Sequence, residues 1–173
     1  GVAGTGGIRI IGEDHRVQNN YLEGLMGELF ESAMPINDGI PETPLNGYFR
    51  VQRLTIANNS IIDCAQSLSF GVGHGARNRV EEARGVTVAN NLIVSSHGPL
   101  VRFYSQPTDA TWQGNVLFGA EPGIEHAGVR VVDPKLVADD HGIKRPSEPI
   151  DAGADIGKPI DRAETGVRWN LTE

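Results

Sequence analysis

The chain has little cysteine, no long apolar run and few charged residues. Cys64 is the only cysteine among 173 residues, which excludes an internal disulfide framework and a cysteine-rich zinc site. We expect its thiol to be buried and structural, because it follows an apolar run. No stretch approaches the roughly 20 apolar residues that span a membrane, and the N-terminus lacks the basic-then-apolar pattern of a signal peptide. We therefore expect a soluble chain that has lost its original start.

Basic residues are also scarce. The formal net charge is -7, with 15 Lys and Arg against 22 Asp and Glu. Proteins that bind nucleic acids or anionic membranes need clustered Lys and Arg to replace counterions, so we expect neither partner. An anionic substrate is compatible with this net charge only where arginines gather on one face.

Glycine and proline, by contrast, are plentiful. With 22 Gly, 10 Pro and only 21% charged residues, the composition favours strands and turns over long helices. A length of 173 residues suits one domain with one hydrophobic core. The fold class expected from composition is all-β.

A repeat emerges when the chain is aligned on its asparagines. Each unit is a short alternating strand, an Asn-Asn or Gly-Asn corner and a second short apolar strand, with the last corner residue at Asn20, Asn59, Asn91 and Asn115. The intervals are 39 (59-20), 32 (91-59) and 24 (115-91) residues. A solenoid tolerates such variation where extra residues leave the coil as loops, and we expect the insertion of the longest interval at residues 35–44.

Asparagine suits such a corner for two reasons. It tolerates the left-handed backbone conformation of a sharp bend, and its amide can hydrogen-bond to nearby main chain. Stacked coils would place these amides above one another as a ladder that satisfies buried polar groups. The alternative is a set of unrelated hairpins that each turn on Asn.

Further strands with alternating side chains lie between the corners, at residues 7–12, 67–71 and 100–104. If their apolar residues point into a core, Arg9, Ser69 and Arg102 point outward, although a slip of one residue would reverse the last of these. We expect these strands to stack into a parallel sheet whose polar outer face can bind an extended polymer.

The repeat fades after Phe118 into a stretch rich in Gly and Pro. A solenoid needs a cap, because its last coil otherwise exposes core and strand edges. We therefore expect residues 1–128 to form the coils and residues 129–173 to form an irregular C-terminal cap of the same domain.

Several stretches resemble polysaccharide lyase family 6, the alginate lyase and chondroitinase B family. Residues 6–20 (GGIRIIGEDHRVQNN) resemble a motif of its late coils, and residues 44–48, 63–64 and 70–73 resemble later stretches in the same order. The resemblance covers residues 1–75 best. It implies a right-handed parallel β-helix of the pectate-lyase-like kind and cleavage of a uronate-containing glycan by β-elimination.

The same resemblance implies a lysine base, an assisting arginine and calcium, which offsets the charge of the uronate carboxylate. In the family these groups lie on coils that precede the motif, and the lysines here, Lys135, Lys144 and Lys158, all fall in the expected cap. The catalytic residues are thus unknown and expected before Gly1, with no metal ligand in this chain. We therefore expect this chain to be part of a larger enzyme, either joined to its missing N-terminal coils or paired with them as a separate chain. The family also implies a secreted or periplasmic location.

Five residues are candidates for substrate binding. Arg9 matches a substrate-contacting arginine of the family, and a guanidinium can grip a carboxylate in bidentate fashion; its alternative role is a surface ion pair with Glu13 or a neighbouring coil. Arg102 and Tyr104 would extend the same face, while His74 and Arg77 occupy a loop after a sheet strand. For these four, a solvated face or a polar connection is the alternative.

Other polar groups are interpreted as structural. His15 beside Asp14 is expected to make a structural hydrogen bond at a corner rather than to form an acid-base pair. The runs Glu81-Glu82 and Asp139-Asp140 are expected to be solvated rather than to bind a metal or cleave a glycoside.

The leading functional hypothesis is thus a polysaccharide lyase that acts on an acidic glycan, most readily alginate, with this chain supplying late coils and a binding surface. The alternatives are a non-catalytic carbohydrate-binding or structural β-helix, and a pectin-degrading hydrolase, which would need paired outward carboxylates.

Overall fold

Strands dominate the computed structural model, which describes residues 6–147. The first parallel sheet has the order β1-β4-β7-β10, formed by Arg16–Gln18, Gln52–Ala57, Arg84–Ala89 and Thr108–Gln113. The second has the order β2-β5-β8-β11-β12, formed by Tyr21–Glu23, Ser60–Ile62, Leu92–Ser95, Asn115–Gly119 and Val129–Val131. The third has the order β3-β6-β9, formed by Met34–Asn37, Leu68–Val72 and Val101–Phe103.

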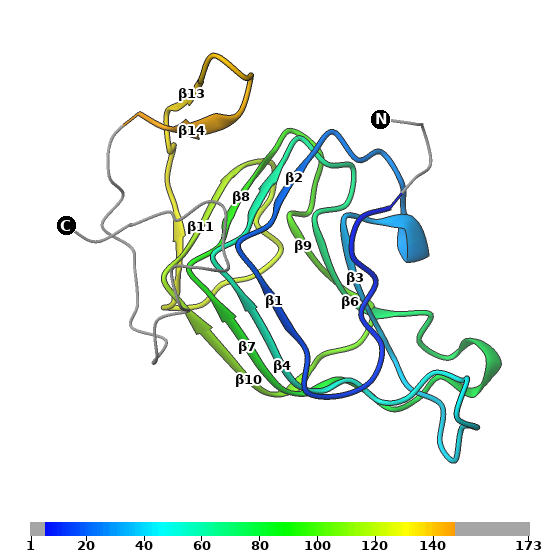
Figure 1. Ribbon diagram of the computed structural model, residues 1–173. Coiled ribbons are helices and arrows are strands. Elements are labelled where there is room, and N and C mark those ends of the chain that lie inside the picture. Colours follow the sequence, from blue (N-terminus) through cyan, green and yellow to red (C-terminus); the bar gives the residue numbers. More distant parts are fainter. Residues whose placement is uncertain (1–5, 148–173) are drawn as a thin grey trace, which may run out of the picture.

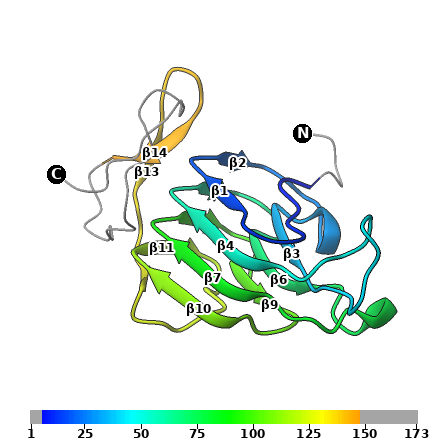
Figure 2. The ribbon, with the colours of Figure 1, turned by 60° about the horizontal axis from the view of Figure 1, so that its bottom comes forward.

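Each coil contributes one strand to each sheet, and successive coils stack in register. Thr55 of β4, for example, pairs with Arg16 of the coil before it and with Thr87 of the coil after it. Figure 1 shows the three sheets around one core, and Figure 2 shows the strands stacked coil upon coil. The predicted right-handed parallel β-helix is confirmed.

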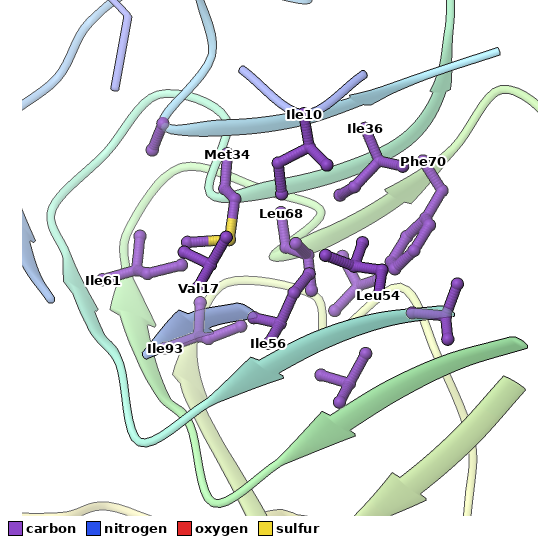
Figure 3. Packing of buried hydrophobic residues seen from close by; sticks show 14 of the residues in the cluster. Ile10, Val17, Met34, Ile36, Leu54, Ile56, Ile61, Leu68, Phe70 and Ile93 are labelled. Carbon is purple, nitrogen blue, oxygen red and sulfur yellow. The ribbon is translucent and has the colours of Figure 1, made fainter. Parts of the chain in front are cut away.

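The core is a column of inward side chains from all three sheets. Figure 3 shows Ile56 of the first sheet, Ile61 of the second and Leu68 of the third pointing toward one another, and each is at most 1% exposed. The core also contains aromatic rings in the later coils. Phe70 and Phe103 stack there with ring centroids 5.5 Å apart. Cys64 is buried in this core, where burial raises the pKa of its thiol, as expected for a structural cysteine.

The asparagine ladder is confirmed at all four corners. Nδ2 of Asn20 donates to Oδ1 of Asn59, Nδ2 of Asn59 to Oδ1 of Asn91, and Nδ2 of Asn91 to Oδ1 of Asn115, at 2.9, 2.9 and 3.0 Å. The backbone bend falls one residue earlier, where a positive φ occurs at Asn19, Asn58, Asn90 and Gly114. The two corner positions therefore have different roles. The first residue makes the turn, and the side chain of the second satisfies buried polar groups.

Three sequence expectations need correction. The strand expected at residues 7–12 is reduced to a single bridge between Ile10 and Ile36. The insertion expected at residues 35–44 starts later, because Pro35 belongs to β3, where an edge strand tolerates a residue without an N–H. Ser69 alternates away from the core but is fully buried, because the larger residues Pro35 and Arg102 flank it in register.

The segment after the last full coil is tied back to the β-helix. β12 still extends the second sheet, whereas β13 (Leu136–Ala138) and β14 (Lys144–Pro146) form an antiparallel hairpin that lies beside the second sheet in Figure 1. Nζ of Lys144 lies 2.8 Å from Oε1 of Glu23 and 2.5 Å from Oδ2 of Asp63. The division at residue 128 stays a prediction, and residues 148–173 lie outside the described part of the chain.

Lys144→Met should loosen this hairpin without unfolding the coils. Half-exposed ion pairs contribute roughly 1 kcal/mol or less each, so we expect a small change in global stability and clearly faster hydrogen exchange at the amides of β13 and β14. Lys135→Met, on an exposed residue of the same segment, is the matched control. Unchanged exchange in the Lys144 variant would contradict a docking role for this lysine.

The difference in exchange protection of β13 and β14 between the wild type and the Lys144→Met variant should also depend on pH. Hydrogen bonding to Lys144 lowers the pKa of Glu23 from its ordinary value of 4.5, so this contribution is complete above that value and is lost as the pH falls through the lowered one. Hydrogen bonding to Asp63 and Glu23 raises the pKa of Lys144 above its ordinary value of 10.5, so its contribution is complete below 10.5 and is lost at higher pH. Exchange protection should differ most between about pH 5 and 10.

In the part of the chain that the structure describes, no helix is long and apolar enough to cross a membrane.

Candidate functional site

Arg9 and Arg79 flank the ring of Phe30 on the third sheet's side of the molecule. The guanidinium carbon of Arg9 lies 5.4 Å from the centroid of the Phe30 ring, and that of Arg79 lies 5.3 Å from it. The Arg79 guanidinium also lies 4.0 Å from the centroid of Tyr48. These distances are within the range of cation–π attraction. We call these four residues, Arg9, Phe30, Arg79 and Tyr48, the arginine–aromatic row.

Arg9 is the exposed end of the row. Ile8 and Ile10 pack on or in the core, so strand alternation turns Arg9 outward, as predicted. Its Nε and Nη2 atoms donate to the carbonyl oxygen of Phe30 at 3.2 and 2.8 Å, rather than to Glu13, which pairs with Arg53. A guanidinium has five N–H donors, so three remain to bind a ligand while the other two fix its position.

Arg79 is the buried part of the row, with 6% of its surface exposed. Its Nη1 atom donates to the carbonyl oxygen of Ala76 at 3.4 Å, and its Nε atom has no partner among residues 6–147. The rings of Phe30 and Tyr48 therefore provide most of its stabilisation. The same contacts pack the guanidinium against both rings, so Arg79 is the buried member that joins Phe30 and Tyr48 in the row.

A second cluster lies where the three strands of the third sheet end. Asp38, after β3, is completely buried, and its Oδ2 atom lies 2.6 Å from Nδ1 of His74, after β6. Ser105, after β9, donates from Oγ to Oδ1 of the same carboxylate at 2.9 Å. Three successive coils thus supply one residue each to a buried carboxylate whose histidine partner reaches the surface.

Two glycines make this arrangement possible. Gly71 has a φ of +72°, and a Cβ at this position would lie 2.3 Å from the backbone nitrogen of Ser105. A Cβ at Gly73 would lie 2.8 Å from the ring of Phe30 and 2.9 Å from Cδ of Arg79. Because only glycine allows such approach, the segment that carries His74 packs directly against the arginine–aromatic row.

The other predicted site residues are less closely joined to this surface. Arg102 aligns in register with Ser69 on the outer face of the third sheet, and its Nη2 atom donates to the carbonyl oxygen of Gly98 at 3.1 Å. Tyr104 is half-buried directly before Ser105. Arg77 is exposed in η2 (Ala76–Asn78), a 3-10 turn in which its φ is +53°. Their roles in binding stay predictions.

The hydrogen bond expected of His15 is present, whereas Asp139 pairs with Arg145 rather than being only solvated. Nε2 of His15 lies 2.8 Å from the carbonyl oxygen of Ile11, which confirms the structural hydrogen bond. Asp14 pairs with Arg53, whose hydrogen bonds lower the pKa of this carboxyl. Within residues 6–147, no three His, Cys, Asp or Glu side chains form a group that could hold a metal ion. Calcium, and the expectation that its ligands lie outside this chain, both stay predictions.

Sequence reasoning missed five members of this surface: Phe30, Asp38, Tyr48, Arg79 and Ser105. Asp38 lies in the stretch interpreted as the start of an insertion, and Phe30 lies in an irregular segment with no strand alternation. One sequence signal pointed toward Arg79, because it is the last residue of the polar loop that contains His74, a predicted binding residue. Nothing in the sequence indicated that its side chain turns inward.

Comparisons with known proteins bear on the family and the fold of this chain. Residues 2–108 match a family model described as chondroitinase B. Solved structures of AlyGC, an alginate lyase of polysaccharide lyase family 6, and of an arginine-to-alanine mutant of AlyGC are each 29% identical to the chain, with a TM-score of 0.78. No curated protein matches the chain.

The structural match covers 95% of this chain and 23% of AlyGC, so the chain spans less than a quarter of the length of that enzyme. The family match itself covers more than half of the 173 residues and includes the motif at residues 6–20 together with Asp38 and His74. This chain therefore belongs to the chondroitinase B family, polysaccharide lyase family 6.

Proposed function

We propose that the chain supplies a substrate-binding surface of a polysaccharide lyase that cleaves an acidic, uronate-containing glycan by β-elimination. The observation that carries the proposal is the exposed guanidinium of Arg9, which is held in place by Phe30 on the outer face of a parallel sheet. An immobilised arginine with free N–H donors suits a carboxylate ligand, because less side-chain freedom is lost on binding.

The shape of the third sheet supports a polymeric ligand. Arg9 and Arg102 occupy equivalent outward positions three coils apart, with Pro35 and Ser69 between them. With about 4.8 Å per coil, the two positions are roughly 14 Å apart. Two cationic side chains at this separation on one face suit an extended polyanion better than a single small molecule.

We propose that the described residues do not supply the catalytic chemistry. Lys135 directly precedes β13, which lies beside the second sheet. Lys144 is held by Glu23 of β2 and by Asp63, which follows β5, so neither lies on the proposed binding surface. We propose that the lysine base, its assisting arginine and the calcium ligands belong to coils outside the described residues. Arg9 would orient the glycan toward them by gripping a carboxylate.

The test of the activity is the absorbance of the product. β-Elimination creates an unsaturated uronate that absorbs in the ultraviolet, so the full-length protein should produce this signal with at least one member of a panel of polyuronates. We propose alginate as the substrate, because the solved relative AlyGC is an alginate lyase; chondroitin-type glycans belong in the same panel. The absence of signal across the panel would contradict the proposal.

Arg9→Ala should raise KM for the active polyuronate about tenfold, because a charged hydrogen bond contributes roughly 1.5 kcal/mol or more, and should change kcat less. Arg16→Ala, on an exposed arginine of the first sheet, is the matched control and should leave KM unchanged. Equal effects of the two substitutions would remove the assignment of Arg9 to the binding surface.

A non-catalytic carbohydrate-binding role is the second candidate. It is favoured by the positions of Lys135 and Lys144 away from the binding surface and by the absence of a metal-binding group within residues 6–147. This alternative predicts retention of acidic glycans by the full-length protein without any absorbing product.

A further inference from the structure

We propose that His74 binds a carboxylate of the glycan through its Nε2 atom, and that the buried Asp38 is the positioning residue for this contact. The inference rests on the proposed function, because it names a further ligand contact on the same surface. It adds a carboxylate, Asp38, that does not itself touch the ligand.

The geometry leaves one ring nitrogen of His74 for a ligand. Nδ1 lies 2.6 Å from Oδ2 of Asp38, whose side chain is 0% exposed, whereas the side chain of His74 is 40% exposed. The contact with Asp38 fixes the plane of the ring, as a carboxylate does for a histidine in many sites. Nε2 is then the atom available to a ligand.

Both hydrogen-bonding ends of the carboxylate are engaged. Oδ1 of Asp38 accepts a hydrogen bond from Oγ of Ser105 at 2.9 Å, so the carboxylate cannot rotate without losing one of its two partners. Burying a carboxylate is costly unless it is paired and hydrogen-bonded. Among the described residues, His74 is the partner of Asp38 that can carry a positive charge.

The backbone around His74 is held as well. The N–H of His74 donates to the carbonyl oxygen of Gly71 at 2.9 Å, and the N–H of Gly75 donates to the carbonyl oxygen of Arg79 at 2.8 Å. Gly73 packs against Phe30 and Arg79. The imidazole is thus anchored to the arginine–aromatic row and is not merely part of a polar connection.

The surroundings favour an anion as the ligand. A protonated imidazole donates from both nitrogens, so Nδ1–H can bond to Asp38 while Nε2–H bonds to a carboxylate of the glycan. Arg9 belongs to the row against which this segment packs, and Asp38, the carboxylate in contact with the ring, is sealed from solvent. An acidic sugar therefore meets donors on this surface, with the negative charge of Asp38 beneath them.

The experiment measures dissociation constants by titration calorimetry on the full-length protein. One ligand is a short uronate oligosaccharide that the protein does not turn over, and the other is its carboxyl-reduced, neutral counterpart. The variants are His74→Ala, Asp38→Asn and the double substitution, with Ser105→Ala as a milder change at the same carboxylate. His141→Ala, on an exposed histidine of the β13–β14 loop, is the matched control.

We expect His74→Ala to raise the dissociation constant of the uronate oligosaccharide about tenfold and to leave that of the neutral oligosaccharide unchanged. Asp38→Asn alone should raise the dissociation constant of the uronate oligosaccharide about fivefold. The double substitution should have the same effect as His74→Ala alone, because Asp38 acts through the His74 imidazole. Ser105→Ala should raise this dissociation constant only about two- to threefold, because the contact between Asp38 and His74 is kept while one hydrogen bond to the carboxylate is lost. His141→Ala should have no effect. If Asp38→Asn does not fold, the His74 and Ser105 variants still decide the outcome.

Equal losses for the acidic and neutral oligosaccharides would overturn the carboxylate contact, and additive effects of the two substitutions would overturn the positioning role of Asp38. If the wild type binds the uronate oligosaccharide and no variant differs from it, this inference fails while the proposed function stands. If the wild type does not bind it at all, both fail.

Discussion

Asn91→Ala is expected to lower the free energy of unfolding by about 4 kcal/mol. Oδ1 of Asn91 accepts hydrogen bonds from both N and Nδ2 of Asn59, and its Nδ2 atom donates to the carbonyl oxygen of Ile56 and to Oδ1 of Asn115. Asn91 is 1% exposed, so water cannot replace it. Each buried polar group left without a partner costs about 1–3 kcal/mol, and several are left at once. Urea unfolding followed by circular dichroism measures the loss.

Asn20→Ala is the matched control for the ladder. Among the described residues Asn20 is the first rung and is only partly buried, and its side chain loses bonds to the carbonyl oxygen of Gln18 and to Oδ1 of Asn59. Its backbone N–H still donates to Oδ1 of Asn59, and water can reach the site, so we expect a loss of about 1 kcal/mol. Equal losses at the two positions would show that the ladder is not a main source of stability.

Gly71→Ala should be about as damaging, for a steric reason. The positive φ of Gly71 costs an L-residue about 1–2 kcal/mol, and the added Cβ would lie 2.2 Å from Oγ and 2.3 Å from N of Ser105. The side chain of Ser105 could rotate, but its backbone nitrogen can move only if the end of β9 shifts. We expect a total loss of about 3–4 kcal/mol, together with loss of the hydrogen bond from Ser105 to Asp38.

Gly75→Ala separates the two causes. Gly75 has a similar φ of +75°, but nothing lies within 4 Å of an added Cβ. This variant should therefore show the backbone cost alone, about 1 kcal/mol. The difference between the two alanine variants measures the overlap with Ser105, and a difference near zero in urea unfolding would contradict the close approach of the two coils.

The two substitutions also link stability to the site. Gly71 and Ser105 lie on adjacent coils, and Ser105 holds the carboxylate that in turn contacts His74. A shift of β9 at this point would be transmitted to the imidazole through two hydrogen bonds. The same coil stacking that makes the fold stable thus fixes the geometry of the proposed binding surface.

Much of the coil architecture was predictable because its signals are local. A residue pair such as Asn58-Asn59 combines a preference for the left-handed bend with an amide that must find partners, and both properties are visible in the sequence. The outward position of Arg9 followed from strand alternation alone. Ser69 shows the limit of the same argument, because alternation gives the direction of a side chain but not what covers it.

The site was less predictable because its members come from different coils and from irregular segments. Asp38 and His74 are 36 residues apart, and Asp38 and Ser105 are 67 apart. Such contacts depend on how many residues each coil extrudes before its next strand begins, and the sequence marks those loop lengths poorly. Pro35 illustrates this, since it predicts a loop by composition but lies in β3.

The sequence by itself determined that this chain forms stacked parallel coils with asparagine corners and an outward Arg9, because backbone preference and side-chain alternation act between near neighbours in the chain. Only the tertiary structure decided that Phe30 and Tyr48 cover Arg79 and that Asp38 holds His74. The physical reason is that these contacts form between successive stacked coils. There the register between coils, rather than any local preference, determines which side chains meet.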